Sequence, residues 1–183
     1  MAKAVLISIQ PKWCELIASG KKTVEVRKTR PKIDTPFKCY IYCTKDKHGW
    51  FDFLNKTRRD GKVIGEFVCD YIEEFKEFEY GLDALHRHIK LNACMGYDDI
   101  YKYLGLEKCG YGWHISDLVI YDKPKELSEF YKYCGDNPKC DGCEAHYYSN
   151  TECGKEDYCC SIMDGCKPLK RPPQSWCYVE EGD

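Results

Sequence analysis

Short apolar runs separated by polar turns predict a chain built mostly of β-strands. The first run, AVLISI at residues 4–9, is continuous and predicts a buried strand. In TVEVR at residues 23–27 polar and apolar positions alternate, as they do in a strand with one buried face. Gly65 inside a later run indicates a bulge or a close backbone approach. Strands are predicted over residues 4–9, 23–27, 37–44, 61–71, 113–121 and 175–180.

Two short helices are predicted between these strands. The first begins at Gln10-Pro11 and ends at Gly20, and its spacing places Trp13, Leu16 and Ile17 toward the core. The second covers residues 98–104 and ends at Gly105. A turn is expected at residues 122–124 (DKP). Strands with short helices and many turn signals predict an α+β fold, a small mixed β-barrel flanked by short helices, and not a doubly wound sheet.

Charge is distributed unevenly along the 183 residues. The net charge is only −2, but residues 1–60 hold 14 Lys/Arg and 6 Asp/Glu, a net of +8, and residues 61–183 therefore carry −10. A basic N-terminal third produces a local positive field unless folding interleaves the two parts and cancels it. With 14% aromatic residues, including 15 Tyr, the composition suits binding surfaces as well as cores.

The segment Gly20–Arg27 (GKKTVEVR) carries the most chemistry. Glu25 and Arg27 are two residues apart on a strand, so both project from the same face, and Lys22 lies at the turn just before. Lysine and arginine bind phosphate, and arginine also pairs with a carboxylate or a guanine edge. The alternative is a surface Glu–Arg pair on a polar strand face, which contributes little to stability.

This segment resembles the ASCH family, in the wider PUA-like group, whose signature is G-x-K-x-x-E-x-R after an N-terminal strand and helix. Gly20, Lys22, Glu25 and Arg27 match all four signature positions. The lead-in SIQPKWCELIASG and the later GKVIGEF, YGWHISDLVIY and SWCYV segments are also similar. The resemblance implies a PUA-like barrel with a cleft between barrel and helix that binds RNA or nucleotides.

The resemblance also leaves an enzymatic alternative open. One ASCH-like branch comprises amidohydrolases that deacylate acetylated cytidine with a Lys, a Thr and a Glu, and other members are ribonucleases. Aligned on the turn, Lys22 keeps the lysine, but Glu25 stands where that branch has its threonine nucleophile. Thr23 would have to act from another position. If the protein is an enzyme, Lys22 and Glu25 are the candidate catalytic residues.

Aromatic side chains near the predicted cleft are candidates for base stacking. They are Trp13, Tyr42, Tyr111, Trp113 and Trp176. The helical spacing of Trp13 favours the core instead, whereas Tyr111 and Trp113 flank a turn where aromatic side chains can stay accessible. The predicted ligand-binding set is Gln10, Lys12, Lys22, Glu25, Arg27, Tyr111, Trp113 and Ser175.

A Cys-rich stretch near the C-terminus has almost no aliphatic residues, so hydrophobic burial cannot order it. Its Cys-x-x-Cys pair and nearby histidine indicate a structural zinc site, since two thiolates at that spacing reach one tetrahedral ion. Disulfides, an iron–sulfur cluster and free thiols are the alternatives. The candidate ligands for one or two zinc ions are Cys134, Cys140, Cys143, His146, Cys153, Cys159, Cys160 and Cys166.

These observations predict three segments: a barrel over residues 1–133, a Cys-rich insert over 134–169, and a final strand and tail over 170–183. The expected function is binding of RNA or a nucleotide in a basic cleft. A hydrolase acting on a modified nucleoside or on single-stranded RNA, and an adaptor that contacts a protein partner through the Cys-rich insert, are the alternatives. The sequence shows neither a signal peptide nor a membrane span, so a cytoplasmic location and no membrane partner are expected.

Overall fold

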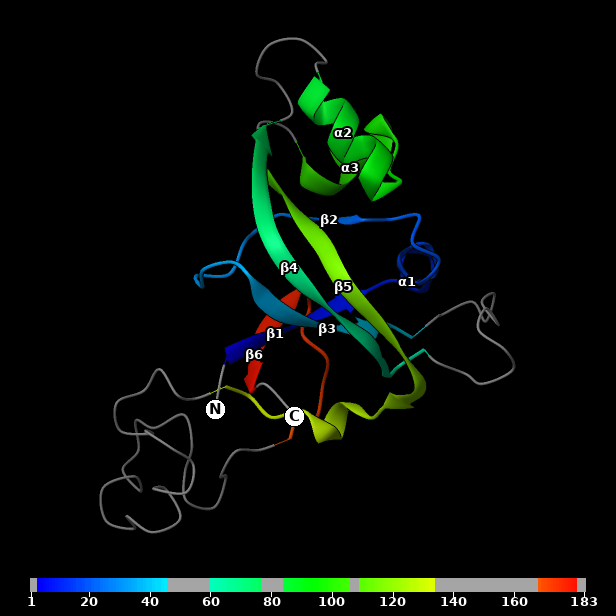
Figure 1. The fold of residues 1–183 in the computed structure, drawn as a ribbon, viewed down its shortest axis with the longest axis vertical. Helices are drawn as coiled ribbons and strands as arrows, with labels where there is room; N and C mark the ends of the chain where they lie inside the picture. Colours follow the sequence, from blue (N-terminus) through cyan, green and yellow to red (C-terminus); the bar gives the residue numbers. More distant parts are fainter. Residues whose placement is uncertain (1–2, 46–59, 77–83, 106–108, 134–167, 181–183) are drawn as a thin grey trace.

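The fold is a six-stranded sheet with three α-helices around it, among the residues that the structure describes (Figure 1). The structure is a computed structural model that describes residues 3–45, 60–76, 84–105, 109–133 and 168–180. Its elements are β1 (Lys3–Ile9), α1 (Pro11–Ala18), β2 (Val24–Arg27), β3 (Phe37–Cys43), β4 (Val63–Lys76), α2 (Ala84–Ala93), α3 (Tyr97–Leu104), β5 (Cys109–Lys125), the 3₁₀ turn η1 (Leu127–Glu129) and β6 (Trp176–Glu180).

The sheet is an open, curled barrel with the strand order β2-β5-β4-β3-β1-β6. β1 pairs parallel with β3, and every other strand pair in the sheet is antiparallel. Within the described residues, backbone pairing does not join the two edge strands, β2 and β6. Side chains of β6 contact the chain that follows β2 instead: Trp176 Nε1 donates to Thr29 Oγ1 (3.1 Å), and the Tyr178 hydroxyl accepts from the Lys32 backbone N–H (2.6 Å). The predicted α+β fold and mixed barrel are therefore confirmed, with the barrel left open.

Three apolar clusters hold the fold together. The largest fills the inside of the curled sheet, where α1 packs Cys14 and Ile17 against β1, β3 and β4. A second covers the opposite side of β1 and β3, beneath Phe130. The third joins the helices α2 and α3 to Val24 and Val26 of β2. In Figure 1 these two helices lie together at one end of the long β4–β5 ribbon.

Most predicted elements are present. β4 and β5 are longer than predicted, and the helix α2 was not predicted. The turn predicted at 122–124 is wrong, because β5 continues to Lys125, which pairs with Val63. Pro124 is tolerated there because the ladder is irregular between Val63 and Gly65, where β5 contributes extra residues. Gly65 itself makes the expected close approach: a Cβ there would lie 2.3 Å from the Val119 carbonyl oxygen.

The Cys-rich segment 134–167 lies outside the described residues, so its predicted boundaries stay predictions. The chain on either side of it is placed: an isolated bridge joins Tyr131 to Pro168, and another joins Lys132 to Val179. The two ends of the segment therefore meet beside β6. Among the helices that the structure describes, none has the length and hydrophobicity required to cross a bilayer.

Candidate functional site

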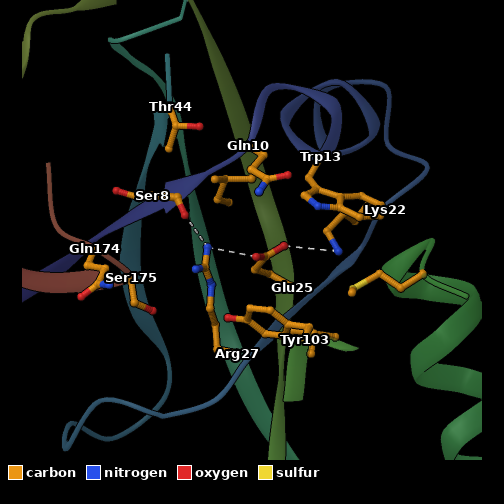
Figure 2. A pocket seen from close by; sticks show the side chains of 13 residues that line it. Ser8, Gln10, Trp13, Lys22, Glu25, Arg27, Thr44, Tyr103, Gln174 and Ser175 are labelled. Atoms are coloured by element: carbon orange, nitrogen blue, oxygen red, sulfur yellow. Dashed lines mark hydrogen bonds and ion pairs between the residues drawn. The ribbon is translucent and has the colours of Figure 1, made fainter. Parts of the chain in front are cut away.

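A cavity of about 320 Å³ opens between α1, the ends of β1 and β2, and the helix pair α2–α3. Figure 2 shows the side chains that surround it. Polar and charged groups make up much of its wall. The lining residues are Ser8, Ile9, Gln10, Trp13, Lys22, Glu25, Val26, Arg27, Thr44, Met95, Tyr103, Gln174 and Ser175.

Three charged residues of the signature segment form a buried ionic triad in this wall. Glu25 Oε2 lies 3.3 Å from Lys22 Nζ, and Glu25 Oε1 lies 3.0 Å from the Arg27 guanidinium. The whole residues are only 1% (Lys22), 6% (Glu25) and 7% (Arg27) exposed. The alternative of a solvated surface pair is therefore wrong. Two cations against one carboxylate leave the triad with a net charge of +1.

Local geometry explains how the signature produces this triad. Gly20 ends α1 with a positive φ of 71°, which a residue with a side chain adopts only at a cost, and so turns the chain toward β2. Alternation along β2 then points Val24 toward the helix pair and Glu25 and Arg27 toward the cavity, as predicted. Lys22 reaches the cavity from the turn and donates to the Ala93 carbonyl oxygen at the end of α2 (2.8 Å).

One donor of the triad has no partner among the described residues. Arg27 Nη2 donates to the Ser8 carbonyl oxygen (2.6 Å), but Arg27 Nε is buried and finds no partner among the described residues. Buried donors are normally paired, so such an atom beside a cavity is a candidate ligand contact. The Ser8 hydroxyl, in contrast, donates to the Pro173 carbonyl oxygen (2.7 Å).

Two aromatic side chains from different helices contribute to the wall. Trp13 comes from α1 and Tyr103 from α3, and Figure 2 shows them on either side of Glu25. Trp13 packs against the main core, as its spacing predicted, and its half-buried ring also lines the cavity. Trp113, in contrast, was expected to stay accessible but is 0% exposed inside the sheet.

The cavity brings together five of the predicted ligand-binding residues: Gln10, Lys22, Glu25, Arg27 and Ser175. Three others lie elsewhere. Tyr111 packs half-buried against the main core, Trp113 belongs to that core, and Lys12 lies beside Trp13 with Nζ 4.1 Å from the ring centroid. Sequence reasoning missed the polar wall residues Ser8, Thr44 and Gln174, and also Met95 and Tyr103. Ser8 lies within a correctly predicted strand, and Thr44 and Gln174 lie at the ends of two others, so their position next to these strands is the one signal that pointed to them.

A separate polar cluster on β4 and β5 is structural. His114 Nε2 lies 3.4 Å from Glu73 Oε2, and the imidazole stacks on Tyr71 with centroids 3.6 Å apart. Burial lowers the pKa of His114 below its usual value of 6.5, and the nearby Glu73 opposes this shift. His114 is therefore a packed, hydrogen-bonded histidine.

The predicted zinc ligands cannot be placed, because all of them lie in 134–167. Within the described part of the chain, no cluster of three or more His, Cys, Asp or Glu side chains is arranged to hold a metal. Cys14, next to Trp13 in the chain, is buried in the core, and burial raises the pKa of its thiol well above the ordinary value, so it lacks the thiolate character of a reactive cysteine.

Comparisons with known proteins agree with this fold. Solved structures with the same fold include an ASCH protein from Zymomonas mobilis, with a TM-score of 0.58 and 18% identity over 97% of this chain and 88% of that one. Two single-residue mutants of that protein, a Tyr-to-Phe and a Ser-to-Ala variant, give TM-scores of 0.58, at 18% and 17% identity. The Tyr-to-Phe match covers 98% of this chain and 92% of that one, and the Ser-to-Ala match covers 97% and 89%. No curated protein matches the chain. The family model of the ASCH domain matches residues 7–134, which include the whole triad and most of the cavity wall, so the chain belongs to the ASCH domain family.

Proposed function

We propose that the cavity binds RNA or a nucleotide, with the buried ionic triad as its electrostatic centre. Lys22 and Arg27 provide the positive field and the donors for a phosphate or a base edge, and Glu25 holds both cations in place. Trp13 and Tyr103 stack on the ligand. The observation that carries the proposal is the net positive triad beside a cavity, with Arg27 Nε buried and without a partner among the described residues.

The energetics of the triad support an anionic or hydrogen-bonding ligand. Burying charges is costly, and a buried ion pair often stabilises a protein no better than apolar residues of the same volume. Here one carboxylate serves two cations, so one positive charge stays without a counterion in the wall. A phosphate or an electronegative base edge supplies the negative charge that the cavity wall lacks. The excess positive charge of residues 1–60 agrees with this preference.

The hydrolase alternative has less support from the geometry. Thr23 Oγ1 lies 3.1 Å from the Asn92 side-chain oxygen on the exposed side of the turn, and Thr23 is not part of the cavity wall. The Lys22 ammonium is directed to Glu25 and to the Ala93 carbonyl oxygen, so it offers donors and not a lone pair. Hydroxyl groups of Thr44 and Ser175 do line the cavity, and turnover of acetylated cytidine or of single-stranded RNA is the assay for that alternative.

The proposal is tested by fluorescence anisotropy of a short labelled single-stranded RNA. Tyr103→Ala removes a stacking surface from the cavity without touching the triad. The expected loss is about five- to a hundredfold in affinity, from the ~1–3 kcal/mol that one stacked base contributes. Tyr131→Ala is the matched control, because Tyr131 is 40% exposed and is not part of the cavity wall. Equal affinity of the wild type and Tyr103→Ala would place the RNA somewhere else.

A further inference from the structure

Lysine ammonium groups lie close to both aromatic rings of the cavity wall: besides the buried Lys22, whose Nζ is 5.1 Å from the Trp13 centroid, each ring has one exposed lysine. Lys12 Nζ lies 4.1 Å from the centroid of the Trp13 ring, and Lys28 Nζ lies 5.2 Å from the centroid of the Tyr103 ring. Both distances are within the range of a cation–π interaction. Both lysines are exposed, whereas the rings beneath them are half-buried. The rings therefore hold two solvated ammonium groups beside the cavity.

Among the residues that the structure describes, neither Lys12 nor Lys28 has a carboxylate within ion-pair distance. The exposed Lys62, in contrast, lies 2.7 Å from Glu126. A cation–π contact restricts a lysine side chain and leaves its full charge available. Each ring thus restricts the motion of its lysine, and no carboxylate among the described residues neutralises Lys12 or Lys28. Both ammonium groups can therefore bind an external anion.

The lysines also belong to different sides of the site. Lys12 is in the first turn of α1, and Lys28 directly follows Arg27 at the end of β2. Figure 2 shows their supporting rings, Trp13 and Tyr103, separated by Glu25. A single terminal phosphate at one ring leaves the other ammonium without an anion. Two phosphates joined by a sugar, as in a nucleic acid strand, provide an anion for each.

We propose that Lys12 and Lys28 are phosphate-binding residues on two sides of the cavity, and that the ligand is a single-stranded nucleic acid that passes over it. One nucleotide contacts the cavity, and the phosphates before and after it contact the two lysines. This inference rests on the proposed function and narrows it: the ligand is an oligonucleotide and not a free mononucleotide. Phosphate contacts fix the position of the strand and carry no sequence information by themselves.

Salt dependence of binding is the direct test. Anisotropy of a labelled RNA hexanucleotide is measured between about 50 and 200 mM salt for the wild type, Lys12→Ala, Lys28→Ala and the double variant. Each lost phosphate contact is expected to reduce the slope of log K against log salt by ~0.7, the value for single strands. Each single variant is expected to bind about two- to fivefold more weakly, as for an exposed ion pair. Lys12→Arg and Lys28→Arg keep the charge and are expected to keep the slope.

The matched control is Lys123→Ala, since Lys123 is an exposed lysine that is neither in the cavity wall nor on one of its rings. It is expected to leave the slope unchanged. A competition experiment compares three unlabelled ligands: a nucleoside 5′-monophosphate, a DNA hexanucleotide and the RNA hexanucleotide. The RNA hexanucleotide is expected to compete much better than the monophosphate, and a difference between the RNA and DNA hexanucleotides reports contacts to the 2′-hydroxyl.

The outcomes separate the two proposals. One outcome is that the hexanucleotide binds, that Tyr103→Ala weakens this binding, and that the lysine variants keep the wild-type salt slope. In that case the proposed phosphate contacts of Lys12 and Lys28 are wrong, and the proposal that the cavity binds the ligand stands. If a nucleoside monophosphate competes as well as the hexanucleotide, the proposal that the ligand is a nucleic acid strand is also overturned. If neither ligand binds the wild type, the proposed function itself fails.

Discussion

Glu25→Gln is the substitution that tests the buried triad most severely. The amide has nearly the shape of the carboxylate but no charge, so Lys22 and Arg27 lose their shared counterion while they remain buried. The amide also turns a donor NH₂ toward one of the two cations. Breaking a buried ion pair by removing one partner costs about 3–5 kcal/mol, because an uncompensated charge is left in the interior.

The loss is large enough to measure by thermal and urea denaturation. For a chain of this length each kcal/mol shifts Tm by about 2–4 °C, so a fall on the order of 10 °C is expected. The control is Glu126→Gln, which removes an even closer ion pair, 2.7 Å to Lys62, at a site where the Glu126 and Lys62 side chains are 57% and 37% exposed. That surface pair is worth about 0–1 kcal/mol. If Glu25→Gln costs no more than Glu126→Gln, the reasoning about a buried charge network is refuted.

A compensated variant separates stability from function. Replacing the whole triad with apolar residues, as in Lys22→Met/Glu25→Leu/Arg27→Met, removes the buried charges together and is expected to recover most of the stability lost in Glu25→Gln. Its Tm is therefore expected to lie close to that of the wild type. If the triple variant is less stable than Glu25→Gln, the charged triad is required for the fold itself. The presence of these buried charges would then not be evidence for a ligand.

Three further predictions concern other parts of the chain. Gly65→Ala places a Cβ 2.3 Å from the Val119 carbonyl oxygen, so denaturation is expected to show a loss of about 1–3 kcal/mol, and an unchanged midpoint would contradict this close approach. Because burial lowers the pKa of His114 in the folded protein, the unfolded chain takes up a proton at this residue at a higher pH than the folded protein, so the free energy of unfolding is expected to fall as pH drops below 6.5. His114→Gln is expected to flatten this dependence, and identical pH–stability profiles of the variant and the wild type would contradict the expectation. Purified protein is expected to contain one or two zinc ions by elemental analysis, lost when residues 134–166 are deleted; metal-free protein with fully titratable thiols would exclude the site.

Local patterns were sufficient to predict the strands that build the site. The alternation in TVEVR predicts Glu25 and Arg27 on one face, Gly20 is predicted to end a helix, and Gly65 is predicted to mark a bulge or a close backbone approach. These features depend only on backbone geometry within a few residues, which a sequence records directly.

Features that depend on distant packing could not be predicted in the same way. Trp13 has the spacing of a core residue, but periodicity does not distinguish a core from the wall of a cavity. Tyr103 reaches the site only because α2 and α3 pack on β2, and the short helix α2 was not predicted at all. Lys22 resembles a surface lysine in sequence; its burial follows from its hydrogen bond to Ala93, 71 residues away.

The central claim is that the triad's cavity binds a nucleic acid ligand, and its most direct test compares the wild type with the apolar triple variant. Anisotropy of labelled single-stranded RNA is measured on both proteins at low and moderate salt, after denaturation has shown that both are folded. The account predicts salt-sensitive binding by the wild type and at least a tenfold loss in the triple variant, roughly 1.4 kcal/mol. Equal affinity of the two folded proteins would contradict the account, because the buried charges would then have no part in binding.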